Sequence, residues 1–314
     1  MLRYISSLPV YLFGLFFLYI SFQYQQMNDL AVYYDTIINE GLYLGDAGFE
    51  FIQFIAIIFF GRDNAIFGLQ VILFITFSSI LFYKMESRPK FYEITVHLTS
   101  PILTIGLLNS IRQSIAFSFL LISYYNRKNF KFSIFFALIA VSIHKASIIA
   151  LLLLVIGEIW QNFSKNSVSV KNRIKLLAVS SILSLSLIYI LFPSVFERYS
   201  TYIFNDTLFT DGRFGEEKIF AWLSFWLFFI TFSWLSFKKV TQWLWLGLAY
   251  TTIILIDSYA RGFGEFQSRL ILINFVIFHV VMLEICSYSK NKYIFLTTGI
   301  IFYLLNPSFL GVLL

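Results

Sequence analysis

The sequence predicts an all-α, polytopic helical membrane protein, and three observations carry this prediction. Hydrophobic residues make up 59% of the 314 residues and charged residues only 13%, a balance too apolar for a soluble domain of this size. The apolar residues gather in repeated runs of about 20 residues, the length that spans a bilayer as a helix. Short basic clusters separate these runs. We therefore expect a single transmembrane domain over residues 1–314, with about eleven crossings.

The distribution of Lys and Arg predicts the topology. Residues 23–50 contain five acidic residues and no basic residue, so the positive-inside rule assigns this segment to the outside. The basic clusters are assigned to the inside, with the N-terminus inside and the C-terminus outside. Two outer segments result, about 23–64 and 193–217. The inner clusters lie at 84–90, 127–131, 165–175, 238–239 and 290–292.

The individual elements follow from these inside and outside assignments, which fix whether the number of crossings between two clusters is even or odd. Residues 1–22 form the first span, while 49–60 are too short for a span and indicate an interfacial or re-entrant helix. The chain crosses an even number of times between consecutive inner clusters, so one helix pair meets near residues 100–113. A second pair of short helices within 132–157 meets at His144–Lys145. The remaining spans are about 174–192, 218–237, 241–257, 266–285 and 293–311.

Three outer helix starts look alike in the sequence: residues 110–113, 142–145 and 267–270. Each combines polar residues with a cation in the expected first turn, namely Arg112, His144 or Arg269. A cation there is unfavourable by about 0.3–1 kcal/mol, because the helix N-terminus is itself positive. Three such cations on one face indicate a bound anion, since helix N-termini and guanidinium groups both bind phosphate.

A plainer interpretation exists for each of these residues taken singly. An arginine near a helix end often extends to the lipid headgroups, and a His-Lys pair at a helical apex is often simply solvated. The set as a whole favours an anion site. Metal ligation is not expected, because one Cys, three His and no compact acidic group offer no ligand set. The net charge of +6 is assigned to loops facing anionic lipid, with no nucleic acid as partner.

These residues also carry a family resemblance. The sequence resembles the EpsG family of bacterial exopolysaccharide polymerases, relatives of the Wzy-type O-antigen and capsule polymerases. The match covers residues 25–275 approximately. Its motifs are R-Q-x-x-A (Arg112, Gln113, Ala116), H-K-x-S (His144, Lys145, Ser147), D-x-x-x-Y (Asp29, Tyr33), D-A-G-F (Asp46 to Phe49), the Glu197-Arg198-Tyr199 element and the late Arg269.

The resemblance implies a GT-C-like, metal-independent membrane glycosyltransferase of the bacterial cytoplasmic membrane, without a cofactor and with its active site on the periplasmic or extracellular side. It would transfer a growing glycan from undecaprenyl diphosphate to a sugar hydroxyl of a lipid-linked repeat unit. Its partners would be the lipid-linked donor and acceptor, the bilayer, a chain-length regulator and a flippase. Arg112 and Arg269 would bind the diphosphate, and His144 would bind a phosphate oxygen or transfer a proton. Substrate-binding candidates are Gln113, Lys145, Arg198, Arg261, Asp29, Tyr33 and Asp46.

Two other classes remain open at this point. A transporter or flippase for a lipid-linked or anionic substrate would place polar residues near the bilayer midplane and show an inverted repeat. A membrane acyltransferase acting on surface glycans would use a cytoplasmic donor. The general base of a polymerase is also open, because each outer carboxylate is expected to be an ordinary solvated loop acid. These carboxylates are Asp29, Asp35, Asp46, Glu50, Glu197, Asp257 and Glu265.

Overall fold

The structure is a computed structural model. It describes residues 28–42, 45–84, 91–98, 100–108, 110–165, 228–229, 241–261 and 265–288, and every regular element among them is an α-helix, in agreement with the predicted fold class. The chain divides into two compact units, Met1–Ser147 and Ile148–Leu314, which we describe separately. The predicted spans at 1–22, 174–192 and 293–311, most of 218–237 and the outer segment 193–217 lie outside the described residues. The total of about eleven crossings and the GT-C-like arrangement stay predictions.

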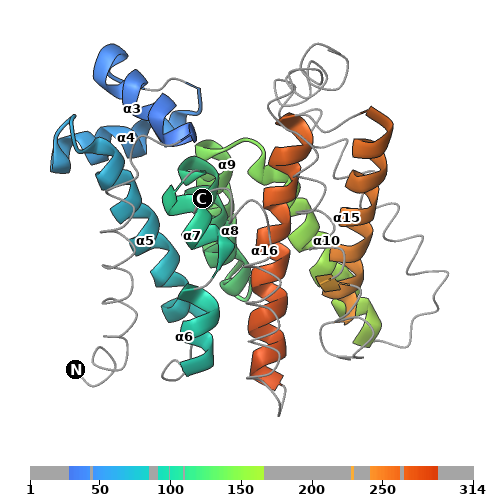
Figure 1. Cartoon of the computed structure of the whole chain (residues 1–314). Coiled ribbons are helices and arrows are strands. Elements are labelled where there is room, and N and C mark those ends of the chain that lie inside the picture. Colours follow the sequence, from blue (N-terminus) through green and yellow to red (C-terminus); the bar gives the residue numbers. More distant parts are fainter. Residues whose placement is uncertain are drawn as a thin grey trace. The chain divides into compact units, whose positions relative to one another are not determined.

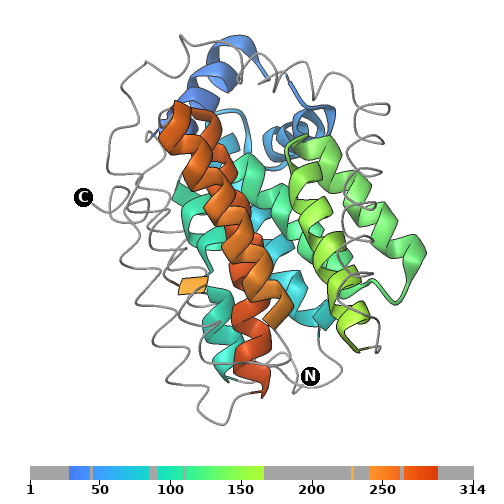
Figure 2. The same cartoon turned by 90° about the vertical axis from the view of Figure 1, so that its right-hand side faces the viewer.

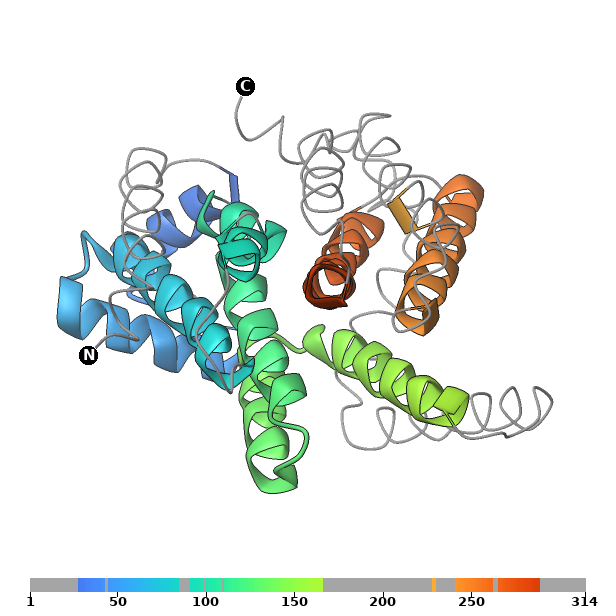
Figure 3. The same cartoon turned by 90° about the horizontal axis from the view of Figure 1, so that it is seen from below.

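The first unit is organised around one buried helix, α8 (Ile111–Tyr125). Nearly every side chain of α8 is buried, and the helix lies between α5 (Ala65–Lys84) and α9 (Phe130–Ile143) (Figure 3). The remaining helices of the unit are α3 (Asn28–Glu40), α4 (Ala47–Phe60), α6 (Phe91–Leu98) and α7 (Pro101–Leu108) (Figure 1).

Helix α4 is a separate helix, as the sequence predicts for residues 49–60. It meets α5 at an angle of 111° and lies across the end of that helix (Figure 1). The turn begins at Gly61, whose φ of 78° is a conformation that favours glycine. One face of α4 is buried and the opposite face is apolar and exposed, with Phe51, Phe54 and Phe59 more than half exposed.

Among the described helices, none is by itself both long enough and apolar enough to span a membrane, whereas α4 and the first part of α5 together satisfy both conditions as a bent pair.

Two helix breaks lie where the even number of crossings between the basic clusters predicts them. α7 ends at Leu108 and α8 begins at Ile111, and α9 ends at Ile143 before α10 (Ser147–Lys165) begins. The first break is stabilised by Gln70 of α5, whose buried amide Nε2 donates to the carbonyl of Leu107 at 2.7 Å. This bond satisfies a carbonyl at a helix end, where no backbone partner is available.

The sequence prediction for the second break is wrong in one respect. The sequence predicts Ser142 as a cap of the following helix and His144 in its first turn, yet Ser142 lies in the last turn of α9 and donates its hydroxyl to the carbonyl of Ile139 at 2.8 Å. His144 is the C-terminal cap of α9, with extended backbone angles (φ −151°, ψ 107°). A serine hydroxyl bonds readily to a carbonyl of the preceding turn, so it marks a helix end here instead of a start.

The second unit contains most of α10 together with α15 (Thr241–Arg261) and α16 (Glu265–Tyr288) (Figure 2). Helices α15 and α16 pack against each other. Trp243 of α15 is fully buried, and the ring of Phe228 packs on that of Phe278 at a centroid distance of 4.7 Å. The predicted spans 241–257 and 266–285 fall within α15 and α16.

A close approach between α4 and α9 fixes the start of α4. The packing occurs at Gly48, where a Cβ atom would lie 2.7 Å from the carbonyl carbon of Ser142 and 2.8 Å from the amide nitrogen of Ile143. Both neighbouring atoms belong to the backbone and cannot rotate away. Only glycine therefore allows the first turn of α4 to rest on the end of α9.

We expect Gly48→Ala to push these two helices apart. The clash of an added methyl group costs about 1–3 kcal/mol, whereas the better helix propensity of alanine returns about 1 kcal/mol. Thermal unfolding of the detergent-solubilised protein, followed by tryptophan fluorescence, should show a lower Tm. The exposed neighbour Ala47 provides the control, because Ala47→Ser also adds one atom but meets no backbone. An equal Tm for both variants would contradict the close approach.

Candidate functional site

The site is built around Asp46, the residue that precedes α4. Its backbone is extended, and its carbonyl accepts the amides of Phe49 and Glu50 at 2.8 and 3.0 Å. The carboxylate of Asp46 makes no capping bond to its own helix. Instead Glu50 reaches back and accepts the Gly45 amide through Oε1 at 2.9 Å. The acidic side chain at the cap position is thereby left to interact with other parts of the chain.

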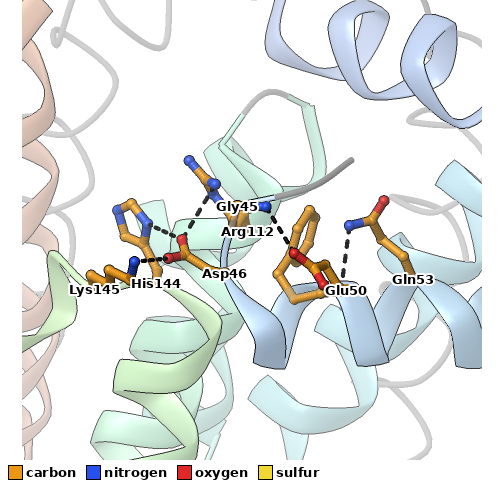
Figure 4. A network of polar contacts seen from close by, with 8 residues as sticks. Gly45, Asp46, Glu50, Gln53, Arg112, His144 and Lys145 are labelled. Atoms are coloured by element: carbon orange, nitrogen blue, oxygen red, sulfur yellow. Dashed lines mark hydrogen bonds and ion pairs between the residues drawn. The ribbon is translucent and has the colours of Figure 1, made fainter. Parts of the chain in front are cut away.

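Three basic side chains converge on this carboxylate (Figure 4). Nη1 of Arg112 lies 3.4 Å from Oδ2, and Nδ1 of His144 lies 3.7 Å from the same oxygen. Nζ of Lys145 lies 3.9 Å from Oδ1. Arg112 is the second residue of α8, and the other two belong to the connection between α9 and α10. We refer to these four residues as the Asp46 cluster.

The Asp46 cluster is buried on all sides except one. Asp46, Arg112 and His144 are 2%, 6% and 7% exposed, whereas the side chain of Lys145 is 41% exposed and forms the open edge. The expectation that every outer carboxylate is a solvated loop acid is therefore wrong for Asp46. The fold of α4 against α9 at Gly48 removes this carboxylate from water.

The charge state of Asp46 follows from opposing effects. Burial raises the pKa of its carboxyl group, but the interaction with His144 and the charges of Arg112, His144 and Lys145 outweigh burial. The net result is a pKa below the ordinary value of 3.8, so the group is an anion at neutral pH.

Arg112 also contacts an aromatic ring. Its guanidinium carbon lies 5.8 Å from the centroid of the Phe49 ring, within range of a cation–π contact. Phe49 is fully buried and packs on the ring of Tyr33 of α3 at 5.4 Å. Residues of α3 and of the start of α4 thus contribute both the counter-charge and the aromatic support of this arginine.

The cluster carries surplus positive charge. Arg112 and Lys145 contribute two positive charges and Asp46 one negative charge, which leaves +1 even with a neutral imidazole. Such a surplus in a largely buried site favours the binding of an anion, because the low local dielectric strengthens the attraction. Helix α8 adds to this field, since Arg112 lies at its positive N-terminal end.

The structure brings together Asp46, Arg112, His144 and Lys145 from the set predicted by sequence. Gln113 is buried beside Arg112 on α8, and Tyr33 is buried against Phe49. Asp29 lies in the first turn of α3, Arg261 is the last residue of α15 and Arg269 lies near the start of α16. The structure describes the backbone but not the side chains of these three residues, and Arg198 lies outside the described residues.

The sequence did not reveal the supporting roles of Gly48, Phe49 and Glu50. The D-A-G-F motif contains the first two, and the close approach required at Gly48 is the signal that could have indicated their role. In the described part of the chain, no group of His, Cys, Asp and Glu side chains is suited to hold a metal ion. Metal independence itself stays a prediction.

The fold and the cluster define an all-α protein with a candidate anion-binding site at the ends of its helices. Comparison with known families gives a more specific assignment: residues 7–310 match the EpsG family, so the chain belongs to this family of Wzy-type polysaccharide polymerases. The family indicates a membrane protein of polysaccharide biosynthesis. Neither the curated proteins nor the solved structures contain a match to the chain.

We expect Asp46→Asn to destabilise the protein in a pH-dependent manner. Because the pKa of Asp46 is lower in the folded chain than its ordinary value of 3.8, the carboxylate stabilises the fold at every pH above that value. This contribution disappears as the pH falls through the folded pKa. The Tm difference between wild type and variant should correspond to about 1–3 kcal/mol near neutral pH and shrink below pH 3.8.

The exposed residue Asp63 provides the matched control for this measurement. Asp63→Asn removes the same charge from the turn between α4 and α5 and should leave the Tm unchanged at neutral pH. A Tm gap for Asp46→Asn that stays constant down to pH 3 would contradict the lowered pKa.

Proposed function

We propose that this protein polymerises a cell-surface polysaccharide by transferring the growing glycan from undecaprenyl diphosphate to a sugar hydroxyl of a lipid-linked repeat unit. The reaction would take place on the outer side of the bacterial cytoplasmic membrane. Family membership supplies the general activity, a polysaccharide polymerase. The single observation that supports the finer proposal is the convergence of Arg112, His144 and Lys145 on one buried carboxylate.

The charge of the reaction matches this cluster. As the bond to the sugar breaks, negative charge develops on the departing diphosphate. Cations that are already in place stabilise this charge without reorganisation, which is the most effective form of electrostatic catalysis. The guanidinium group of Arg112 suits the role because its planar donors bind phosphate in pairs. Lys145, at the exposed edge, would meet the incoming diphosphate first.

The position of the cluster within the helices also supports a lipid diphosphate as ligand. The Asp46 cluster lies where α4 and α8 begin and where α9 ends. Helix ends in membrane proteins lie near the headgroups, which is the depth of the diphosphate in a polyprenyl carrier. Family membership supports a polymerase over a flippase.

The role that we propose for Arg269 rests on the sequence alone. Its cation near the start of α16 matches the arrangement of Arg112 near the start of α8. We propose that both arginines bind the diphosphate. We also propose a chain-length regulator and a flippase as partners of the protein.

The proposal can be tested with purified protein in lipid nanodiscs. The substrate is the lipid-linked repeat unit extracted from cells that lack this protein, and the product is a ladder of glycan lengths on a gel. We expect Arg112→Ala to lower the polymerisation rate by about 100-fold, the effect of losing a donor that binds transition-state charge. Lys145→Ala should lower it by about tenfold, because a half-exposed cation acts through a higher dielectric.

The control for charge and side-chain length is Arg62→Ala, since Arg62 is exposed in the turn between α4 and α5. This variant should produce the wild-type ladder, whereas Arg269→Ala should resemble Arg112→Ala. An undiminished ladder from Arg112→Ala would remove this residue from the mechanism. The absence of any ladder from wild-type protein with authentic substrate would refute the proposed reaction.

A further inference from the structure

We propose that Asp46 is a positioning residue for His144 and that His144, through Nε2, accepts the proton of the attacking sugar hydroxyl. This inference rests on the proposed polymerase function and deepens it, because the general base of the reaction is otherwise unassigned. The geometry of two side chains, one from the start of α4 and one from the end of α9, carries the argument.

The carboxylate of Asp46 distinguishes the two nitrogens of the imidazole ring. Its Oδ2 lies 3.7 Å from Nδ1 of His144. In a neutral imidazole one nitrogen carries the proton and the other a lone pair. A carboxylate beside Nδ1 stabilises the tautomer with the proton on Nδ1, so the lone pair is on Nε2. The same carboxylate stabilises the imidazolium that forms when Nε2 takes up a proton.

The backbone on each side of the ring is fixed. The amide of His144 donates to the carbonyl of Ala140 at 3.0 Å, and its carbonyl accepts the amide of Ser147 at 2.8 Å. His144 therefore ends one helix and joins the next, in a conformation that both helices restrain. Its side chain is only 9% exposed, so the surrounding packing restricts rotation of the ring.

The other groups of the cluster are poor candidates for the proton acceptor. Asp46 is surrounded by three basic groups, which stabilise its anionic form and weaken it as a base. Arg112 and Lys145 carry protons and offer no lone pair. Glu50 accepts the amide of Gly45 and serves the helix start. An imidazole, whose reference pKa is about 6.5, exchanges protons readily near neutral pH.

The proposed step is balanced in atoms and electrons. The proton of the acceptor hydroxyl moves to Nε2 of His144 while the hydroxyl oxygen bonds to the anomeric carbon of the donor glycan. The bond from that carbon to the diphosphate oxygen breaks, and its electron pair leaves with undecaprenyl diphosphate. Arg112 and Lys145 face the new negative charge, and Asp46 faces the new imidazolium. Water takes up the proton after the product has moved on.

The test compares Asp46→Asn with the control Asp63→Asn in nanodiscs, using kinetics and anion binding. We expect Asp46→Asn to lower kcat by about 100-fold, within the range that general base catalysis contributes. Its KM for the lipid-linked donor and its affinity for inorganic pyrophosphate should be retained or improved, because the variant is more positive. A lower kcat together with a higher KM and weaker pyrophosphate binding would indicate a purely structural role and overturn the proposal. An unchanged kcat would overturn it as well.

A spectroscopic measurement tests the tautomer without any substrate. The chain contains three histidines, so ¹⁵N-histidine labelling gives a simple spectrum in which His144→Gln identifies the signals of His144. Above the titration range of the ring, we expect a protonated Nδ1 in the wild type and in Asp63→Asn, and a shift towards protonated Nε2 in Asp46→Asn. Identical His144 tautomers in all three proteins would refute the positioning role.

A rescue variant guards against misfolding of Asp46→Asn. Asp46→Glu keeps the negative charge, and we expect it to retain the wild-type tautomer and to recover about tenfold of the lost kcat. If Asp46→Glu instead shows the asparagine variant's tautomer and kcat, the charge is not what positions the ring. If the wild type forms no ladder, the proton-acceptor role fails together with the proposed function, while the tautomer spectrum still decides whether Asp46 orients His144.

Discussion

The buried carboxylate of Asp46 is the interaction on which the candidate site depends. It joins three segments that are far apart in sequence: the start of α4, the start of α8 and the connection after α9. Without it, Arg112, His144 and Lys145 would be basic groups without a counter-charge in a poorly solvated place, and their mutual repulsion would destabilise the fold. With it, each cation has a partner of opposite charge, so the cost of burial is offset by mutual attraction.

Several features of the first unit keep this carboxylate in place. Glu50 accepts the amide of Gly45 just before α4, while the carboxylate of Asp46 makes no capping bond to that helix. Gly48 lets that helix start rest on the end of α9, and Gln70 secures the break from which α8 and Arg112 begin. The ring of Phe49 adds a cation–π contact to the guanidinium of Arg112. Each feature is local, and together they set the distances within the cluster.

The sequence identified Arg112, His144 and Lys145 because polar residues that interrupt apolar runs are easy to recognise. It did not reveal the burial of Asp46, since this depends on the 111° angle between α4 and α5 and on the contact at Gly48. Neither hydropathy nor helix periodicity encodes such an angle. The helix order and the two breaks followed from charge parity, because short basic clusters restrict the number of crossings between them.

The prediction of His144 as a site residue rests on a partly wrong electrostatic argument. A cation in the first turn of a helix is unfavourable, and this description fits Arg112 at the start of α8. His144 instead caps the end of α9, where the negative end of the helix dipole favours a cation. A protonated ring is thus supported both by that helix end and by Asp46. The end of α9 is therefore a suitable location for the proton-acceptor role that we propose for His144.

A carboxylate within an anion site also has a functional consequence for turnover. Arg112, Lys145 and a protonated His144 without Asp46 would bind a diphosphate tightly both before and after the transfer. Uniform binding of this kind does not accelerate the chemical step, and it slows the departure of the leaving group. Asp46 reduces the surplus charge while keeping the cations in their positions. The proposed reaction releases a spent lipid diphosphate in every cycle, so a site with a moderate positive surplus and fixed geometry suits it better than one with the greatest possible charge.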